Sequence, residues 1–72
     1  MIIVTGASRG LGQAISERLI ENGEDVIGLA RKPNGLNIRA IECDVSDHAS
    51  VKNAAKEVKR MKTPVKAVIN AA

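Results

Sequence analysis

Three glycines stand close together near the start of the chain, in the stretch VTGASRGLG that covers residues 4–12. Apolar residues before them predict a buried strand, and the residues after them predict an amphipathic helix. The first backbone N–H groups of a helix have no partner inside the helix, and the helix dipole makes that end positive. Glycines there tolerate left-handed backbone angles and let an anion approach the backbone, so this stretch predicts a phosphate-binding turn.

Each glycine has its own expected role in this turn. Gly6 makes the tight exit from the strand, Gly10 admits a diphosphate, and Gly12 lets the helix pack closely on the sheet. We expect the hydroxyl of Thr5 to brace the turn. A Walker-type nucleotide loop is excluded, because no Gly-Lys-Ser or Gly-Lys-Thr follows. A glycine-rich turn that binds no ligand remains the alternative.

Four segments rich in Ile and Val, each bounded by Gly, Pro, Asn or Asp, are typical of strands. They cover residues 1–5, 25–30, 38–43 and 65–70. A helix is predicted after the first strand and after the third, so the strands are expected to be parallel. Right-handed crossovers then predict an α/β fold with strand order 3-2-1-4, one helix on each face, and the polar third strand at an edge.

Both predicted helices show apolar residues at a spacing of three and four. Leu11, Ile15 and Leu19 indicate a helix in the stretch of residues 11–23, with Gly23 just past its end as the left-handed residue that closes the last turn. The second helix is indicated by Val51, Ala54, Ala55, Val58 and Met61. Ser46 or Asp47 is expected to be its N-cap. Residues 31–37, between the second and third predicted strands, are broken by proline and glycine and are predicted to form a loop.

The predicted sheet is wider than its two helices. Four strands span about 19 Å, whereas a helix is about 10 Å across, so half of each face is left bare. The strand at residues 65–70 would be an exposed edge, which invites pairing with another chain. We expect self-association through this edge, or contact with a missing C-terminal half.

Length and composition exclude several classes of protein. The 72 residues make at most one domain, and 44% hydrophobic and 26% charged residues are ordinary globular values. A net charge of +3 without any aromatic residue gives no stacking surface, so no nucleic-acid partner is expected. The single Cys43 offers neither a disulfide nor a metal site. No apolar run reaches the roughly 18 residues that a membrane span needs, and a cytoplasmic location is expected.

The spacing Thr5-Gly6-x-x-x-Gly10-x-Gly12 resembles the N-terminal motif of the short-chain dehydrogenase/reductase family. Two further stretches match in register: CDVSD after the third strand and NAA at the end of the fourth. The resemblance covers all 72 residues and implies the N-terminal, dinucleotide-binding half of a Rossmann fold, with four parallel strands in the order 3-2-1-4. It also implies that residues 6–12 hold the diphosphate and the adenosine ribose, with the Leu11 amide facing a phosphate oxygen.

Three other segments receive roles from the same resemblance. Asp44 would accept a hydrogen bond from the adenine amino group, with the backbone of Val45 beside it. The adenosine-ribose side would be lined by Asn70, Ala71 and Ala72. Two alternatives stay open: Asp44 caps a loop, and Asn70 only ties the fourth strand to its neighbour.

The end of the second strand indicates the cofactor. An NAD-binding fold usually carries Asp or Glu there, roughly 20 residues beyond the glycines, whereas this chain has Arg31 and Lys32. A guanidinium grips the extra phosphate of NADP with two parallel hydrogen bonds, whereas a carboxylate repels it. Arg9 and Ser8 would approach the same phosphate from the glycine turn. The prediction is NADP rather than NAD; the alternative is that these cations are exposed loop charges.

The family's hydride transfer uses a Tyr-x-x-x-Lys pair, and this chain contains no tyrosine. No catalytic residue and no metal ligand is assigned, and His48 is expected to be solvated near a helix start. The resemblance therefore implies the NADP(H)-binding portion of a truncated oxidoreductase that acts on an alcohol or carbonyl, with the catalytic half absent. The alternative is a stand-alone, non-catalytic nucleotide-binding module, possibly oligomeric.

Overall fold

The computed structural model describes residues 1–8, 10–32 and 38–71. The predictions for Arg9 and Ala72 lie outside these residues. The chain forms four strands and two helices in the order β1 (Ile2–Thr5), α1 (Gly10–Glu21), β2 (Val26–Ala30), β3 (Ala40–Glu42), α2 (His48–Arg60) and β4 (Ala67–Asn70). Each predicted element is therefore present. The third and fourth strands are shorter than the predicted segments 38–43 and 65–70.

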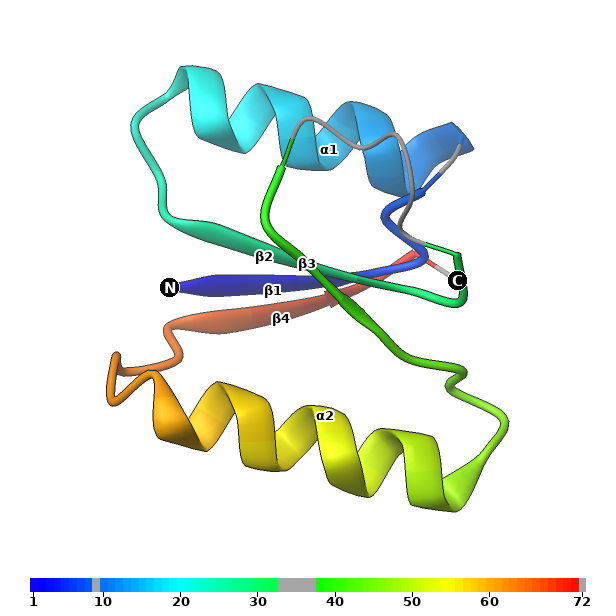
Figure 1. Cartoon of the computed structure of the whole chain (residues 1–72). Coiled ribbons are helices and arrows are strands. Elements are labelled where there is room, and N and C mark those ends of the chain that lie inside the picture. Colours follow the sequence, from blue (N-terminus) through cyan, green and yellow to red (C-terminus); the bar gives the residue numbers. More distant parts are fainter. Residues whose placement is uncertain (9, 33–37, 72) are drawn as a thin grey trace.

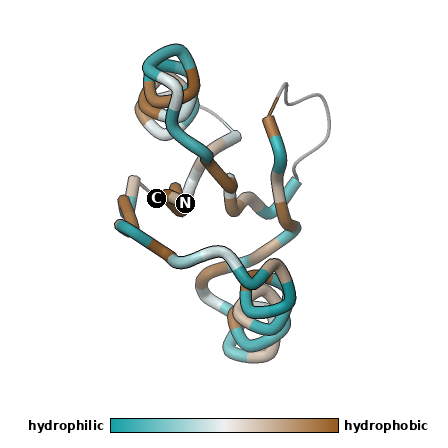
Figure 2. Tube along the Cα trace, turned by 90° about the vertical axis from the view of Figure 1, so that its left-hand side faces the viewer, coloured by the Kyte–Doolittle hydropathy of each residue, from teal (hydrophilic) through white to brown (hydrophobic). Residues whose placement is uncertain are grey.

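All four strands are parallel, and their order across the sheet is β3-β2-β1-β4, as predicted. Ile2 pairs with Val26 of β2 and with Ala67 of β4, so β1 lies at the centre of the sheet. The two helices cover opposite faces (Figures 1 and 2). From β1 the chain continues to β2 and β3 on one side of β1, and then crosses to β4 on the other side. The strand order therefore reverses at β1. In such sheets ligands bind beside the carboxyl ends of the strands at this reversal.

The core consists of two apolar layers, one on each side of the sheet. Ile2, Val4 and Val26 form the layer on one side, and Leu19 of α1 packs against it. Ile27 and Ala54 are buried as well, and Ala54 is the one residue of α2 that is fully buried. Residues of one strand point alternately to the two faces, so the short apolar runs in β1 and β2 supply both layers.

Helix α1 approaches the sheet through small residues, which corrects the predicted apolar face. Gly12 and Ser16 are its buried residues, whereas Leu11 has 69% of its surface exposed. Ser16 keeps its hydroxyl satisfied by donating to the carbonyl of Gly12 at 2.8 Å. At Gly12 the helix lies very close to the backbone of Gly6, so only small side chains fit on the side of α1 that contacts the sheet. The larger side chains of α1 lie to either side of this contact. Gly23 follows the helix with φ +83°, as its predicted role at the helix end requires.

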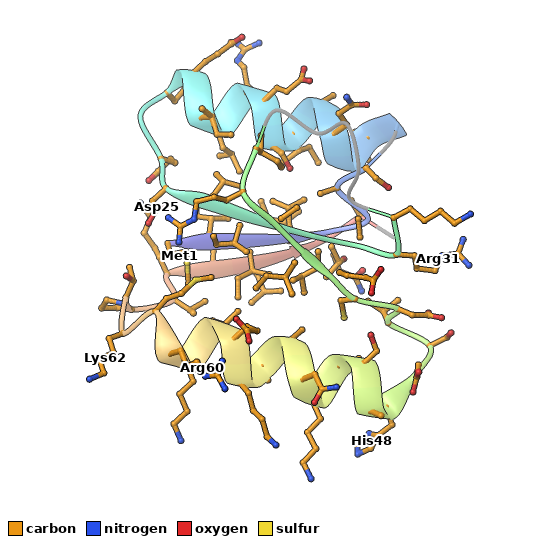
Figure 3. All side chains as sticks on the ribbon, viewed as in Figure 1. Met1, Asp25, Arg31, His48, Arg60 and Lys62 are labelled. Carbon is orange, nitrogen blue, oxygen red and sulfur yellow. The ribbon has the colours of Figure 1, made fainter. Side chains whose placement is uncertain are left out.

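Helix α2 begins at the predicted cap. Asp47 accepts a hydrogen bond from the N–H of Ala49 at 3.1 Å and is therefore the N-cap. Lys59 and Arg60 in its last turn complement the helix dipole. The long basic side chains of this helix extend away from the sheet (Figure 3), which agrees with a solvated outer face. Among the described residues, neither helix is long and apolar enough to cross a bilayer.

Candidate functional site

The glycine turn leads from β1 into α1 with two residues in the left-handed region. Gly6 has φ +63° and Gly10 has φ +58°, which glycine adopts without strain. A Cβ placed on Gly10 would meet no atom within 4 Å, so the space in front of this residue is open. The turn is tied to β2, because the N–H of the buried Ala7 donates to the carbonyl of Leu29 at 3.2 Å. The glycine turn is thus anchored to β2 through Ala7 and faces open space at Gly10.

Gly12 has the close packing that the sequence predicts. A Cβ on this residue would lie 2.1 Å from the carbonyl oxygen of Gly6 and 3.2 Å from that of Thr5. The absence of a side chain therefore brings the first turn of α1 against the end of β1. No acidic residue lies in that first turn, so no carboxylate neutralises the positive end of the helix dipole. Open space, unpaired helix N–H groups and a positive helix end together suit an anion.

Thr5 does not brace the turn as expected. Its hydroxyl instead donates to the side-chain oxygen of Asn70 at 2.7 Å, which joins the carboxyl ends of β1 and β4. Thr5 and Asn70 are direct partners in the parallel register, so their side chains lie on the same face. The alternative that Asn70 ties β4 to its neighbour is therefore realised, and this bond fixes the edge of the site at the end of β4.

An open cleft of about 1000 Å³ lies at the carboxyl edge of the sheet, at the upper end of the usual range for small-molecule sites. It is lined by Gly6, Ser8, Gly10, Leu11, Leu29, Ala30, Arg31, Lys32, Cys43, Asp44, Val45, Ser46 and Ala71. The structure thus brings together nearly all predicted site residues that it describes. Gly12 is buried under the glycine turn, and Asn70 does not line the cleft but is bonded to Thr5. Among the described residues, no cluster of side chains suits a metal ion.

Asp44 is held in place by two serines. Its Oδ1 accepts from the hydroxyl of Ser46 at 2.7 Å and from the N–H of Ser46 at 3.0 Å. Its own N–H donates to the hydroxyl of Ser50 at 2.8 Å. These hydrogen bonds, first from the Ser46 hydroxyl and then from its N–H, lower the pKa of the Asp44 carboxyl; the positive charge of Arg31 adds to the effect. The loop-capping alternative is thus real, but it uses Oδ1: in the described chain, no hydrogen bond involves Oδ2.

Arg31 and Lys32 follow directly after β2, at the same end of the sheet as the glycine turn. Figure 3 shows Arg31 at the opposite end of the sheet from Met1 and Asp25. Both cations are exposed, and among the described residues neither forms an ion pair. Arg31 lines the cleft that also holds Asp44, and its positive charge acts on that carboxylate. The cleft therefore has cations near its β2 corner and a carboxylate near its β3 corner.

Comparison with known proteins agrees with this geometry. The family model described as short chain dehydrogenase matches residues 1–72, the whole chain. The chain belongs to the short-chain dehydrogenase family. Among its relatives is the 3-oxoacyl-(acyl-carrier-protein) reductase MabA of Mycobacterium avium, with 36% identity over 96% of this chain and 28% of that protein.

Solved structures of the family superpose on the chain. Ligand-free aldohexose dehydrogenase of Thermoplasma acidophilum is 36% identical and matches with a TM-score of 0.87 over 99% of this chain and 28% of that one. A 4-hydroxyisoleucine dehydrogenase complexed with NADH and succinate is 27% identical, with a TM-score of 0.88 over 100% of this chain and 34% of that one. This short-chain dehydrogenase chain thus spans about a third or less of the length of these relatives.

Some lining residues of this short-chain dehydrogenase chain were not predicted from sequence. Ser46 was considered only as a helix cap, yet it binds Asp44. The signal was present, because an Asp two residues before a Ser is a common start of a local side-chain-to-backbone turn. Leu29, Ala30 and Cys43 line the cleft because they end two neighbouring parallel strands, a consequence of strand register and not of any motif.

Proposed function

We propose that this chain forms the adenosine-diphosphate side of an NADP(H) site in a short-chain oxidoreductase, and that it is the N-terminal half of that enzyme's dinucleotide-binding domain. The parent enzyme would transfer a hydride between NADP(H) and an alcohol or carbonyl. The observation that carries the proposal is the open glycine turn at the mouth of α1. It faces a cleft that also contains Arg31 and Asp44.

The diphosphate would be bound mainly by the backbone. The N–H groups of the first turn of α1 lack partners within the helix, and the open space at Gly10 lets a phosphate oxygen reach them. Leu11 is exposed and lines the cleft, which supports the role that the family resemblance implies for its amide. Ser8 lines the same cleft and adds a hydroxyl donor.

The adenine would be recognised at the β3 corner. Asp44 lines the cleft, and Ser46 occupies only its Oδ1, so the carboxylate would accept from an amino group through Oδ2 without losing its own support. The lowered pKa favours the ionised form of this carboxyl, in which both oxygens can only accept hydrogen bonds. Val45 has 51% of its surface exposed and lines the same corner, where its apolar surface suits a flat heterocycle.

The choice of NADP over NAD rests on the β2 corner. Arg31 and Lys32 stand where an NAD-binding fold usually has a carboxylate, and in the described residues no salt bridge occupies them. The relative that is complexed with NADH shows that the family also binds the unphosphorylated cofactor. We therefore assign the preference to the charge at residue 31, with Arg9 expected to assist from the glycine turn.

The chemistry of the reaction would come from the nicotinamide, which supplies or accepts the hydride when the cofactor is bound. This chain contributes binding and orientation: it holds the diphosphate, fixes the adenine and selects the ribose phosphate. Asn70 ends β4, and Ala71, which follows it, lines the cleft; both would limit where the adenosine ribose lies, and Ala72 is expected to share this role. No side chain of this chain is assigned to proton or hydride transfer.

The test is a titration of the 72-residue chain by NMR and calorimetry with two fragments of the cofactors, 2′,5′-ADP and 5′-AMP. These ligands differ by the ribose phosphate alone. We expect 2′,5′-ADP to bind more tightly and to shift the amide signals of residues 6–12, 31–32 and 44–45. Arg31→Asp should reduce this preference about tenfold or more, since a hydrogen bond to a charged group contributes about 1.5–3 kcal/mol.

Lys56→Asp is the matched control, because it changes the net charge equally but lies at an exposed position of α2 that does not line the cleft. It should leave the preference between the two ligands unchanged. If Arg31→Asp weakens both ligands equally, the assignment of NADP is wrong. If neither ligand at millimolar concentration shifts the signals of residues 6–12, the nucleotide site itself is wrong.

A further inference from the structure

All but one of the polar atoms of Asp44 are bonded within residues 44–50. Its N–H donates to the hydroxyl of Ser50 at 2.8 Å, and its carbonyl accepts from the N–H of Asp47 at 2.9 Å. Its Oδ1 accepts from both the hydroxyl and the N–H of Ser46. Across the described residues, only Oδ2 has no hydrogen-bond partner, and Asp44 lines the cleft. The residue is therefore held at its backbone and at one carboxylate oxygen, and the other oxygen is available to a ligand.

The bond to Ser50 differs from the others because its partner belongs to a helix. Ser46 and Asp47 lie in the short loop between β3 and α2, as Asp44 does, whereas Ser50 lies in the first turn of α2. Ser50 and Ala54 are four residues apart and share one side of this helix. Ala54 is only 4% exposed, because this side of α2 packs on the sheet. The packing of α2 therefore determines where the Ser50 hydroxyl holds the backbone of Asp44.

A second influence on the Asp44 carboxylate is the positive charge of Arg31. In the part of the chain that the structure describes, no ion pair joins these two residues, so the attraction acts through space and does not fix a direction. Figure 3 shows His48, the first residue of α2, at the same end of the molecule as Arg31. The hydroxyl of Ser50 is therefore the directional contact that keeps Asp44 at the β3 corner against this attraction.

We infer that Ser50 is a positioning residue that makes the cleft selective for adenine over purine bases with an oxo group at C6. The inference rests on the proposed nucleotide site and adds the residue that sets its base selectivity. Ser50 does not line the cleft, so it acts through Asp44. It fixes the backbone of Asp44 and, with it, the place at which Oδ2 accepts a hydrogen bond. Asp44 supplies the acceptor, and Ser50 determines its position.

The selectivity follows from where purine bases carry their hydrogen-bond donors. Adenine has an amino group at C6 and no hydrogen on the neighbouring ring nitrogen, whereas hypoxanthine has an oxo group at C6 and an N–H on that nitrogen. A carboxylate held opposite C6 accepts from the amino group of adenine, but it meets the oxo oxygen of hypoxanthine, and two acceptors left facing each other are costly. A carboxylate that is free to shift accepts from the ring N–H of hypoxanthine instead. Discrimination between the bases therefore depends on how firmly Asp44 is held, and not on its charge alone.

The test is a titration of the 72-residue chain with 2′,5′-ADP and with inosine 2′,5′-bisphosphate, which differ in the base alone. NMR and calorimetry give the two dissociation constants. The wild type should prefer 2′,5′-ADP about tenfold or more, the factor that corresponds to a hydrogen bond to a charged group. Ser50→Ala should reduce this preference about fivefold, because one neutral hydrogen bond no longer holds Asp44. Ser50→Thr keeps the hydroxyl and should keep the preference.

The ratio of the two affinities separates positioning from stability. A variant that is only partly folded binds both ligands more weakly by the same factor, so its ratio stays at the wild-type value. Asn53→Ala is the matched control, because it removes a polar side chain from an exposed position of the same helix that does not line the cleft. It should leave the ratio unchanged.

Failure of this inference can be told apart from failure of the nucleotide site. A Ser50→Ala variant that binds both ligands with the wild-type ratio overturns the role of Ser50 and leaves the nucleotide site intact. The same holds for a Ser50→Thr variant no more selective than Ser50→Ala, and for a wild type that binds the two ligands equally. If neither ligand shifts the amide signals of residues 6–12, the nucleotide site itself is wrong, and the role of Ser50 falls with it.

Discussion

The substitution Gly12→Ala tests the close approach of α1 to the end of β1. Alanine favours a helix by about 1 kcal/mol over glycine, and Gly12 lies within the helix without a left-handed φ. Propensity alone therefore predicts a more stable protein. The structure predicts the reverse, because the new Cβ would lie 2.1 Å from the Gly6 carbonyl oxygen. The sign of the change distinguishes the two arguments.

The size of the effect follows from the overlap. A Cβ almost never comes within 3.0 Å of another heavy atom, so α1 has to move away by about 0.9 Å. The opposing atoms belong to backbone, which cannot rotate aside as a side chain does. Overpacking of this kind costs about 1–3 kcal/mol, and we take the upper end because the neighbour is rigid. After the gain in helix propensity, the free energy of unfolding should fall by about 2 kcal/mol.

A loss of this size is large for this chain. A domain of 72 residues has a total stability of about 4–11 kcal/mol, and a change of about 2 kcal/mol lowers the melting temperature by about 8–16 °C. Thermal unfolding followed by circular dichroism measures the shift. The control is Gln13→Ala, at the exposed neighbouring position of the same helix, which should change the melting temperature by less than about 2 °C. A Gly12→Ala variant that melts at or above the wild-type temperature would refute the close contact.

Three further predictions concern the support of the site. In Gly28→Ala the new Cβ would lie 2.8 Å from the Cβ of Ala7, so the glycine turn should shift and bind 2′,5′-ADP more weakly; adding Ala7→Gly should restore binding, and a double variant no better than the single one would disprove the coupling. Ser46→Ala should raise the pKa of Asp44 toward its usual value, as followed by carboxyl ¹³C NMR, because the strongest hydrogen bond to the carboxylate is lost; an unchanged pKa would contradict this cause. Since the folded-state pKa is lowered, the stabilisation from Asp44 is present above the unfolded-state value of about 3.9 and is lost as the pH falls through the folded value, and the wild type should lose more stability than Ser46→Ala over this range. Ile27→Ala, at a side chain with no exposed surface, should reduce the free energy of unfolding in urea by about 2–5 kcal/mol, and a loss below 1 kcal/mol would contradict its place in the core.

Sequence patterns sufficed for the architecture and for the glycine turn. Apolar runs bounded by turn residues located all four strands, and the handedness of crossovers determined their order. The roles of Gly6, Gly10 and Gly12 could be separated in advance, because each role needs a distinct property of glycine: a positive φ, an open approach, or a missing Cβ. These features depend on local backbone geometry, which short sequence motifs encode directly.

The details that failed depend on contacts between distant segments. Leu11 fits the apolar spacing of α1 but lies exposed, because the close packing at Gly12 turns Ser16 toward the sheet instead. Thr5 was assigned to the turn that follows it, although its partner Asn70 comes 65 residues later. No spacing rule reveals such a partner, because it results from strand register. The support of Asp44 by Ser46 was missed for a different reason, because helix capping explained Ser46 equally well.

The central position of β1 has a consequence for how the chain acquires its structure. Strand β1 can complete its pairing only after β4 has been synthesised, because β1 is bordered by β4 and the Thr5–Asn70 bond spans 65 positions. A sheet closed by such remote contacts forms more slowly than a helical bundle of equal size. Until β4 has been synthesised, the glycine turn of the nascent polypeptide lies beside a sheet in which β1 lacks one of its two neighbours.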